Sequence, residues 1–309
     1  MGDRSGHRPW VVDPLGTEAF EKLASGLAGS ELQSTLLEVM RRRARERTPR
    51  DLVAQHLSDP FCAPSPVDLR ESAAIDAQLL AAAERFEAIE LSPVAPLASS
   101  SAVALTDQNR VLSALRTSEV VSDPTNVLAL ECAARLRVRP AAAVHLATCQ
   151  RVIRAQAVPK IPGFSQHFRI FVLASGGVEE KDHAFTTRAL TDHVRTLLDA
   201  LDRLEKCGYA FGQRRVEVLA TEQRRVLADR VAEAIGPLAV RLPLEHAYYS
   251  GGLRYQIHVT APDGAMAPLI DGGVFDWLSR LTSNRRAVYV ATGCGAQLIA
   301  LRFRPRTNA

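Results

Sequence analysis

The chain is poor in the residues that staple small secreted proteins or hold structural metals. It has five cysteines in 309 residues, and no two of them form a CxxC pair. An odd number of scattered cysteines argues against a disulfide framework or a cysteine-ligated zinc site, and it favours a reducing compartment. The eight histidines show no HxH or HxxxH spacing, so we predict no metal site.

Long hydrophobic runs are also missing. No apolar stretch approaches the roughly 20 residues that a helix needs to cross a bilayer, and residues 1–6 lack the apolar core of a signal peptide. The hydrophobic content of 47% is still enough for a proper core. We therefore expect a cytoplasmic protein with no membrane partner.

The charge is nearly balanced. A net charge of +4 and a pI near 8.9 are too weak by themselves to indicate nucleic-acid binding, so we expect no nucleic-acid partner. Basic residues do concentrate in Arg41–Arg47, at the end of a predicted helix. The simpler interpretation is a solvated helix end that complements the helix dipole, and the alternative is a docking patch for RNA or for a protein partner.

The first 66 residues are predicted to form a helical N-terminal extension and a linker. Thr17–Ala28 and Glu31–Arg47 have helical patterns, and Ser30 between them is the expected N-cap of the second helix. Prolines at positions 60, 64 and 66 then interrupt the chain. We expect a domain boundary there, with one domain over residues 67–309.

The rest of the chain alternates strand patterns with single helices, without strict βαβ order. The helical patterns cover Asp68–Arg85, Val111–Leu115, Thr125–Leu136, Ala184–Lys206 with Gly208 as its C-terminal cap, Glu222–Ile235 and Gly273–Leu281. The strand patterns cover Phe86–Leu91, Phe164–Leu173, Arg215–Leu219, Leu253–Val259 and Ala287–Ala291. This order predicts an α+β fold built around an antiparallel sheet flanked by helices.

One strand pattern carries an arginine into a long turn. Arg151–Gln156 precedes the segment 159–163, which contains proline and glycine, and the aromatic-rich Phe168–Phe171 follows. This pattern predicts two antiparallel strands, and an arginine at such a strand end can fork onto a phosphate or carboxylate. It resembles motif 2 of the class II aminoacyl-tRNA synthetases. The residues that the resemblance implies in nucleotide or ligand binding are Arg154, Gln156, Phe168, Arg169 and, from motif 3, Gly295.

Three further segments resemble histidyl-tRNA synthetase and its paralogue, the regulatory subunit of ATP phosphoribosyltransferase. Ser122–Thr125 resembles the acidic-Gly-Thr element that holds the substrate amino group in that family. Tyr248–Gly251 resembles its Tyr-Tyr-Thr-Gly substrate loop, and Gly272–Asp276 resembles its Gly-Gly-Arg-Tyr-Asp turn. The residues thereby implied in an amino-acid-like pocket are Asp123, Thr125, His246, Tyr248, Tyr249, Gly272 and Gly273.

Each of these assignments has a purely structural alternative. Asp123 precedes a proline at a helix start and could be an N-cap. The tyrosine pair could pack on the sheet, and the glycine pair could be only a turn before a helix. Arg154 and Arg169 could form structural ion pairs.

The helix, strand and proline that end at Pro93 resemble class II motif 1, which builds the dimer interface of that family. The resemblance therefore implies a homodimer through the segment Phe86–Pro93. Closed two-fold dimers are also the commonest assembly among soluble proteins.

The resemblance fails at positions that bind polyphosphate or substrate. The motif 3 pattern Gly-x-Gly-x-Glu-Arg reads Gly293-Cys-Gly-Ala-Gln-Leu298, so Leu298 replaces the arginine. Leu244 replaces the histidine-specific arginine, Val274 replaces the arginine of the glycine turn, and Gln156 replaces the glutamate that reads adenine. Adenylate formation needs positive charge around a polyphosphate, and each lost donor costs about 2.7–4 kcal/mol of transition-state stabilisation.

Three functional hypotheses follow. The first is a synthetase paralogue that has lost ordinary tRNA charging and binds a small amino-acid-like or nucleotide ligand in a regulatory or accessory role. The second is an active ATP-dependent ligase that forms an acyl-adenylate or aminoacylates a non-tRNA acceptor. The third is an RNA-binding or scaffold protein. ATP and Mg²⁺ are compatible with the first hypothesis but not required by it, a protein partner is compatible with it, and we expect no anticodon-binding domain.

Overall fold

The computed structural model describes residues 14–158, 164–245 and 248–304. Its helices are α2 (Thr17–Glu21), α3 (Gly29–Arg45), α4 (Pro49–Ser58), α5 (Leu69–Ala82), α6 (Pro124–Val138), α7 (Ala184–Lys206), α8 (Arg225–Ile235), α9 (Trp277–Thr282) and α10 (Ala296–Arg302). Its strands are β1 (Glu87–Ala88), β2 (Val94–Pro96), β3 (Ser113–Ala114), β4 (Ser118–Val120), β5 (Val144–Ile153), β6 (His167–Val178), β7 (Arg214–Ala220), β8 (Ala239–Pro243), β9 (Leu253–Thr260), β10 (Met266–Phe275) and β11 (Ala287–Cys294).

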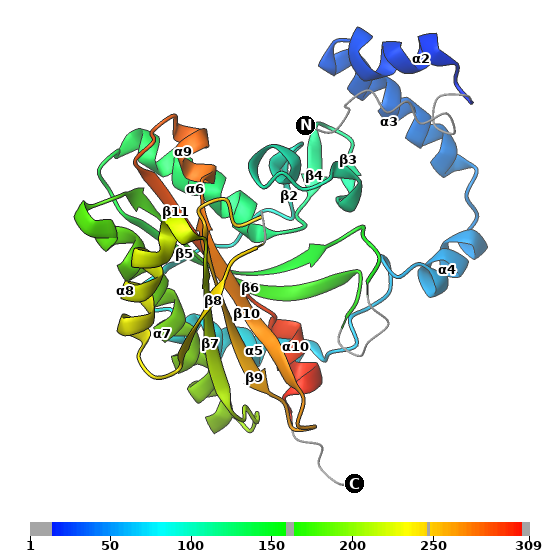
Figure 1. Cartoon of the computed structure of the whole chain (residues 1–309). Helices are drawn as coiled ribbons and strands as arrows, with labels where there is room; N and C mark the ends of the chain where they lie inside the picture. The colour runs from blue at the N-terminus through cyan, green and yellow to red at the C-terminus, as the bar shows by residue number, and fades with distance from the viewer. Residues whose placement is uncertain (1–13, 159–163, 246–247, 305–309) are drawn as a thin grey trace, which may run out of the picture.

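A large, mostly antiparallel sheet forms the body of the molecule (Figure 1). Its eight strands have the order β1-β5-β6-β11-β10-β9-β7-β8, and only the outermost pairs β1·β5 and β7·β8 are parallel. A separate three-stranded sheet, β2-β4-β3, lies between β1 and α6 in the sequence. The predicted α+β fold with an antiparallel sheet is confirmed.

The two faces of the large sheet are covered by different helices. Because side chains alternate along a strand, Phe171 and Leu173 of β6 pack into the core under α5, α7, α8 and α10. Their neighbours Val172 and Ala174 pack on the opposite face, against α6 and α9. Both sets are fully buried, so β6 lies at the centre of the fold.

The helix α7 has the bounds that the sequence predicts. Its apolar residues recur at helical spacing, and eleven of its 23 residues are buried. Gly208 follows it with φ of 93°, a left-handed conformation that glycine adopts without a side-chain clash.

Two predicted helices and one predicted N-cap differ from the structure. The segment predicted as a helix over Val111–Leu115 instead contains β3, since a short apolar run does not distinguish a helix from a strand. The helix predicted over Gly273–Leu281 is α9 alone, because Gly272 and Gly273 lie inside β10 and not in a turn. Helix α3 starts at Gly29, with Ala28 and not Ser30 at its N-cap.

The N-terminal helices stand apart from the body in Figure 1. Helices α2, α3 and α4 contain no buried residue. The linker after them does contact the body, since the backbone carbonyl of Ala63 lies 2.6 Å from Nε2 of His167 and Ser65 Oγ lies 3.2 Å from Oε1 of Gln297. The division of the chain at residue 66 stays a prediction. Across the described residues, no helix is both long and apolar enough to span a membrane.

Candidate functional site

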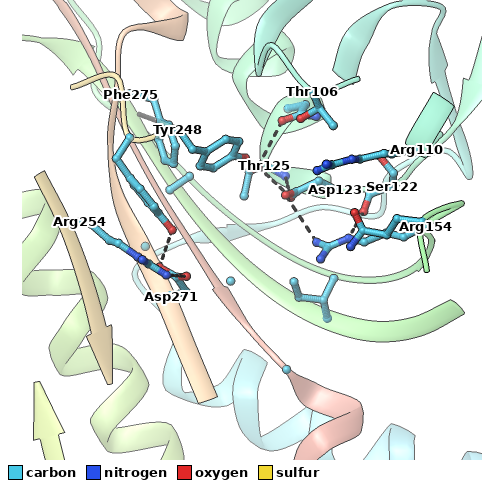
Figure 2. Close-up of a pocket in the computed structure, with 18 of the residues that line it drawn as sticks. Thr106, Arg110, Ser122, Asp123, Thr125, Arg154, Tyr248, Arg254, Asp271 and Phe275 are labelled. Carbon is cyan, nitrogen blue, oxygen red and sulfur yellow. Dashed lines mark hydrogen bonds and ion pairs between the residues drawn. The ribbon is translucent and has the colours of Figure 1, made fainter. Parts of the chain in front are cut away.

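A cavity of about 460 Å³ opens on the α6 face of the large sheet. Strands β6, β9, β10 and β11 and the segment that follows β5 contribute residues to its base, and the segment before α6 forms one wall. Its lining residues are Thr106, Arg110, Ser122, Asp123, Thr125, Asn126, Arg154, Gln156, Ile170, Tyr248, Tyr249, Arg254, Leu269, Asp271, Gly272, Phe275, Ala291, Gly293, Gly295 and Leu298. Figure 2 shows two polar groups in it, one around Asp123 and one around Asp271.

Asp123 organises the first polar group. It is the N-cap of α6, and its Oδ1 accepts hydrogen bonds from the Thr125 backbone N–H at 3.0 Å and from Thr125 Oγ1 at 2.8 Å. The structural alternative for Asp123 is therefore confirmed. Its second oxygen, Oδ2, lies 3.7 Å from Nη2 of Arg154, so the carboxylate also faces the cavity (Figure 2).

Arg154 reaches the cavity from the end of β5. Its backbone N–H donates to the Gln166 carbonyl at 2.8 Å, and its Nε donates to the Ser122 carbonyl at 3.1 Å. Its guanidinium lies over the Phe168 ring, 5.0 Å from the ring centroid. The side chain is still 33% exposed. Phe168 therefore supports Arg154 from below and does not line the cavity itself.

Arg110 is a second cation at this end, which the sequence analysis missed. Its side chain is exposed and extends toward Asp123 in Figure 2. The buried carboxylate of Glu119 fixes the preceding segment, because it accepts hydrogen bonds from the backbone N–H groups of Ala98 and Ser100 and from Gln108 Nε2. The Arg110 carbonyl then accepts from the Ala155 backbone N–H at 2.9 Å.

Asp271 organises the second polar group. Arg254 of β9 donates to both of its oxygens, from Nε to Oδ1 at 3.0 Å and from Nη2 to Oδ2 at 2.6 Å. The Tyr249 hydroxyl donates to Oδ1 at 2.5 Å, and the Arg254 guanidinium lies 4.9 Å from the centroid of the Tyr249 ring. The hydrogen bond to Asp271 raises the pKa of Arg254, and burial raises the pKa of Tyr249. None of this group except Tyr249 was predicted.

Tyr248 and Tyr249 belong to an aromatic wall. The Tyr248 ring lies edge-on to Phe275 at 5.5 Å and to Trp277 at 5.9 Å between centroids, and burial raises the pKa of its hydroxyl. The tyrosines thus pack in the core and line the cavity at the same time. His246, the other residue predicted beside them, lies outside the described residues.

Glycines and apolar side chains also line the cavity, and we call them its floor: Ile170, Leu269, Gly272, Gly293, Gly295 and Leu298. A Cβ on Gly272 would lie 2.4 Å from Oγ1 of Thr292, so only glycine fits there. Gly273 is equally crowded, facing the Leu253 carbonyl, but does not line the cavity. Leu298 covers Gly295, because its Cδ1 would lie 2.9 Å from a Cβ on that glycine.

A buried chain of hydrogen bonds runs beneath this floor. Thr292 Oγ1 lies 2.7 Å from the Tyr255 hydroxyl and 2.8 Å from Nδ1 of His193. Nε2 of His193 lies 2.9 Å from Ser175 Oγ, which lies 2.8 Å from Nδ1 of His145. Complete burial lowers the pKa of His193 to about 3, so this histidine is neutral at physiological pH.

Arg169 is not brought into the cavity. Because side chains alternate along β6, Phe168 and Ile170 face the α6 side and Arg169 faces α5. There its guanidinium pairs with Asp76, which is 6% exposed. The ion-pair alternative is what the structure shows for Arg169, whereas Arg154 and Gln156 do line the cavity.

No group of three or more histidine, cysteine, aspartate or glutamate side chains is placed to hold a metal ion among the residues that the structure describes. The cavity instead offers arginines beside carboxylates. Such a site can bind a small zwitterion or anion through charge-assisted hydrogen bonds.

Comparisons with known proteins show the fold. No protein-family model matches the sequence, and no curated protein matches it. Among solved structures, an ATP phosphoribosyltransferase regulatory subunit/histidyl-tRNA synthetase from Bacillus halodurans is similar with a TM-score of 0.58 and 14% identity, over 79% of this chain and 83% of that one. A histidine–tRNA ligase subunit from Alicyclobacillus acidocaldarius has a TM-score of 0.56 and 14% identity, over 77% and 94%.

Structures of threonyl-tRNA synthetases are similar to this chain to nearly the same degree. A putative threonyl-tRNA synthetase from Aeropyrum pernix has a TM-score of 0.55 and 13% identity, over 74% of this chain and 59% of that one. The chain thus has the fold of the class II synthetase catalytic domains, as the sequence motifs predict.

Proposed function

We propose that this chain is a histidyl-tRNA synthetase-like paralogue that has lost ordinary tRNA charging. It binds a small amino-acid-like or nucleotide ligand in a regulatory or accessory role. The observation that carries the proposal is the lining of the cavity, which has Asp123, Thr125 and Arg154 at one end and Leu298 in its floor.

The charged end of the cavity suits the backbone of an amino acid. The Asp123 carboxylate can accept from an ammonium group, while the guanidinium of Arg154 or Arg110 can donate to a carboxylate or phosphate. The Asp123–Arg154 contact of 3.7 Å is long for a hydrogen bond. Oδ2 of Asp123 and Nη2 of Arg154 can therefore bind a ligand while Oδ1 keeps its bonds to Thr125 and Nε keeps its bond to the Ser122 carbonyl.

The floor supports the loss of adenylate chemistry. Leu298 stands where the resembled motif 3 places the arginine that contacts the γ-phosphate, and it offers no charge to a polyphosphate. An apolar side chain at this point leaves developing negative charge unstabilised, at a cost of about 2.7–4 kcal/mol for each lost donor.

Two arginines at one end also favour the alternative of an active ATP-dependent ligase. Arg110 and Arg154 together could hold a phosphate chain, with Mg²⁺ brought by the nucleotide. Titration with Mg-ATP separates the two proposals, since only the ligase requires productive nucleotide binding.

A homodimer is part of the proposal. Strand β1 lies at the edge of the large sheet and follows α5, as the resembled motif 1 would require. Light scattering should give the mass of two chains at micromolar concentration, and a monomer would remove this part.

The function is tested by a thermal-shift screen over the amino acids and the common nucleotides. A ligand at 100 times its dissociation constant stabilises the protein by about 2.7 kcal/mol. We expect at least one amino acid or nucleotide to do so, and no histidine-dependent pyrophosphate exchange. Robust exchange would replace this proposal with the ligase, and a screen without any hit would overturn it.

A further inference from the structure

We infer that Asp271, held by Arg254 and Tyr249, is the selectivity element of the cavity. It selects a ligand whose side chain ends in a neutral hydrogen-bond donor, and it rejects a ligand whose side chain ends in an anion. The ligand class is therefore an α-amino acid with an amide, hydroxyl or ring N–H in its side chain. This inference rests on the proposed binding function.

Asp271 keeps one acceptor position for a ligand. An ionised carboxylate offers about four lone-pair positions. Arg254 uses one on each oxygen, and the Tyr249 hydroxyl uses a further one on Oδ1. About one position remains on Oδ2. The Asp271 side chain is 39% exposed, so a single donor from a ligand can reach it.

Arg254 cancels the charge of Asp271, so the pair does not attract a cation strongly. The guanidinium is also the less accessible partner, with 20% of its side chain exposed and its face stacked on Tyr249. Both residues line the cavity, but the Asp271 carboxylate is the more exposed of the two. A ligand side chain therefore meets a carboxylate oxygen more readily than the guanidinium, and an anionic side chain is repelled by that oxygen. A neutral donor is favoured over both charged alternatives.

The lining of the cavity is partly apolar. The apolar side chains of Ile170, Leu269 and Leu298 line the same cavity as the Asp123 and Asp271 ends. Such a surface accommodates methylene groups without polar partners. An amino acid with its ammonium at Asp123 and its carboxylate at Arg154 would lay its side chain over this surface toward Asp271.

The test uses isosteric pairs of free amino acids. L-glutamine and L-glutamate, like L-asparagine and L-aspartate, differ in whether a neutral donor or an anion ends the side chain. Calorimetry on the full chain should show the better amide binding at least tenfold more tightly than its acid. The variant Asp271→Asn, which leaves Arg254 without its counter-charge, should reverse the preference toward the acid. Asp229→Asn removes a carboxylate from an exposed ion pair with Arg241 and should leave the wild-type ratio unchanged.

The outcomes are distinct. An acid that binds the wild type as well as its amide overturns the inference and leaves the proposed function standing. If no amino acid or nucleotide binds the wild type, the proposed function fails and the inference falls with it. Should Asp271→Asn unfold, Tyr249→Phe replaces it, because it frees a second acceptor position. The amide-to-acid ratio should then rise, and an unchanged ratio would count against the inference.

Discussion

The two ends of the cavity hold similar charges in different ways. At one end Arg154 and Asp123 lie 3.7 Å apart, and both are partly exposed. At the other end Arg254 donates hydrogen bonds to both oxygens of Asp271 at 2.6 and 3.0 Å, and the Tyr249 hydroxyl donates a third. Groups in a long ion-pair contact can bind a ligand in place of each other, whereas a pair held by short hydrogen bonds keeps its position. We expect the first end to contribute affinity and the second to contribute selectivity.

The largest expected effect is on the pH dependence of stability, and it comes from His193 beneath the floor of the cavity. His193 beneath it is neutral in the folded protein, with a pKa of about 3, while its ordinary value is 6.5. Below pH 6.5 the unfolded chain binds a proton that the folded chain does not, so stability should fall as the pH falls from about 6.5 to 3. The slope from this residue is about 1.4 kcal/mol per pH unit.

Urea unfolding at several pH values measures that slope. The variant His193→Gln removes the titrating group and should show a slope smaller by about one proton across the same window. Equal slopes for the variant and the wild type would mean that His193 does not control the acid sensitivity of the floor.

The next effect should distinguish the two pairs directly. Asp271→Ala leaves the partly buried Arg254 without its carboxylate, and we expect a loss of about 3 kcal/mol in unfolding free energy. This is the low end of the range for breaking a buried pair, because Asp271 is 39% exposed. Urea denaturation provides the measurement. A loss below 1 kcal/mol would show that the second end is no tighter than the first.

A smaller effect, on affinity, is expected from Arg154→Ala. It should weaken binding of the ligand found in the screen by about 2 kcal/mol, which is typical of a charge-assisted hydrogen bond, and it should leave the fold intact. Arg169→Ala is the matched control, since Arg169 lies on the same hairpin but pairs with Asp76 on the opposite face. The control should lose stability and keep its affinity. Calorimetry that gives the reverse result would exchange the roles of the two arginines.

The smallest effect should come from Asp123→Ala. Its contact with Arg154 is long and partly exposed, so the ion pair adds little, and the loss of the N-cap of α6 should cost about 1 kcal/mol. Ligand affinity should fall in addition. Thermal unfolding with and without ligand separates the two effects, and a stability loss as large as that of Asp271→Ala would erase the contrast between the ends.

Much of the fold could be predicted from local patterns. Helix α7 was predictable because its helical period persists over 23 residues. Strand β10 was not, because Gly272 and Gly273 resemble a turn in sequence. They pair with β9 and β11 within the strand, and only glycine fits at both positions because Thr292 and the Leu253 carbonyl leave no room for a side chain. That crowding arises from neighbouring strands and leaves no local signal.

The site was predictable only where a motif marked it. Asp123, Arg154 and the tyrosine pair stand in recognisable segments, and all line the cavity. Arg254 and Asp271 stand 17 positions apart and meet only because β9 and β10 pair in register. Arg169 shows the opposite error, since its closeness to Arg154 in the hairpin conceals that the two residues face opposite sides of the sheet.

Glu119 has a consequence for local unfolding. Three hydrogen bonds to this one buried carboxylate hold the segment that carries Thr106 and Arg110 to the cavity. The small sheet around it is short, so the segment can open as a unit at a lower free energy than the main sheet. Amide hydrogen exchange at Ala98 and Ser100, whose N–H groups bond to Glu119, would therefore report how often the cation Arg110 leaves the site.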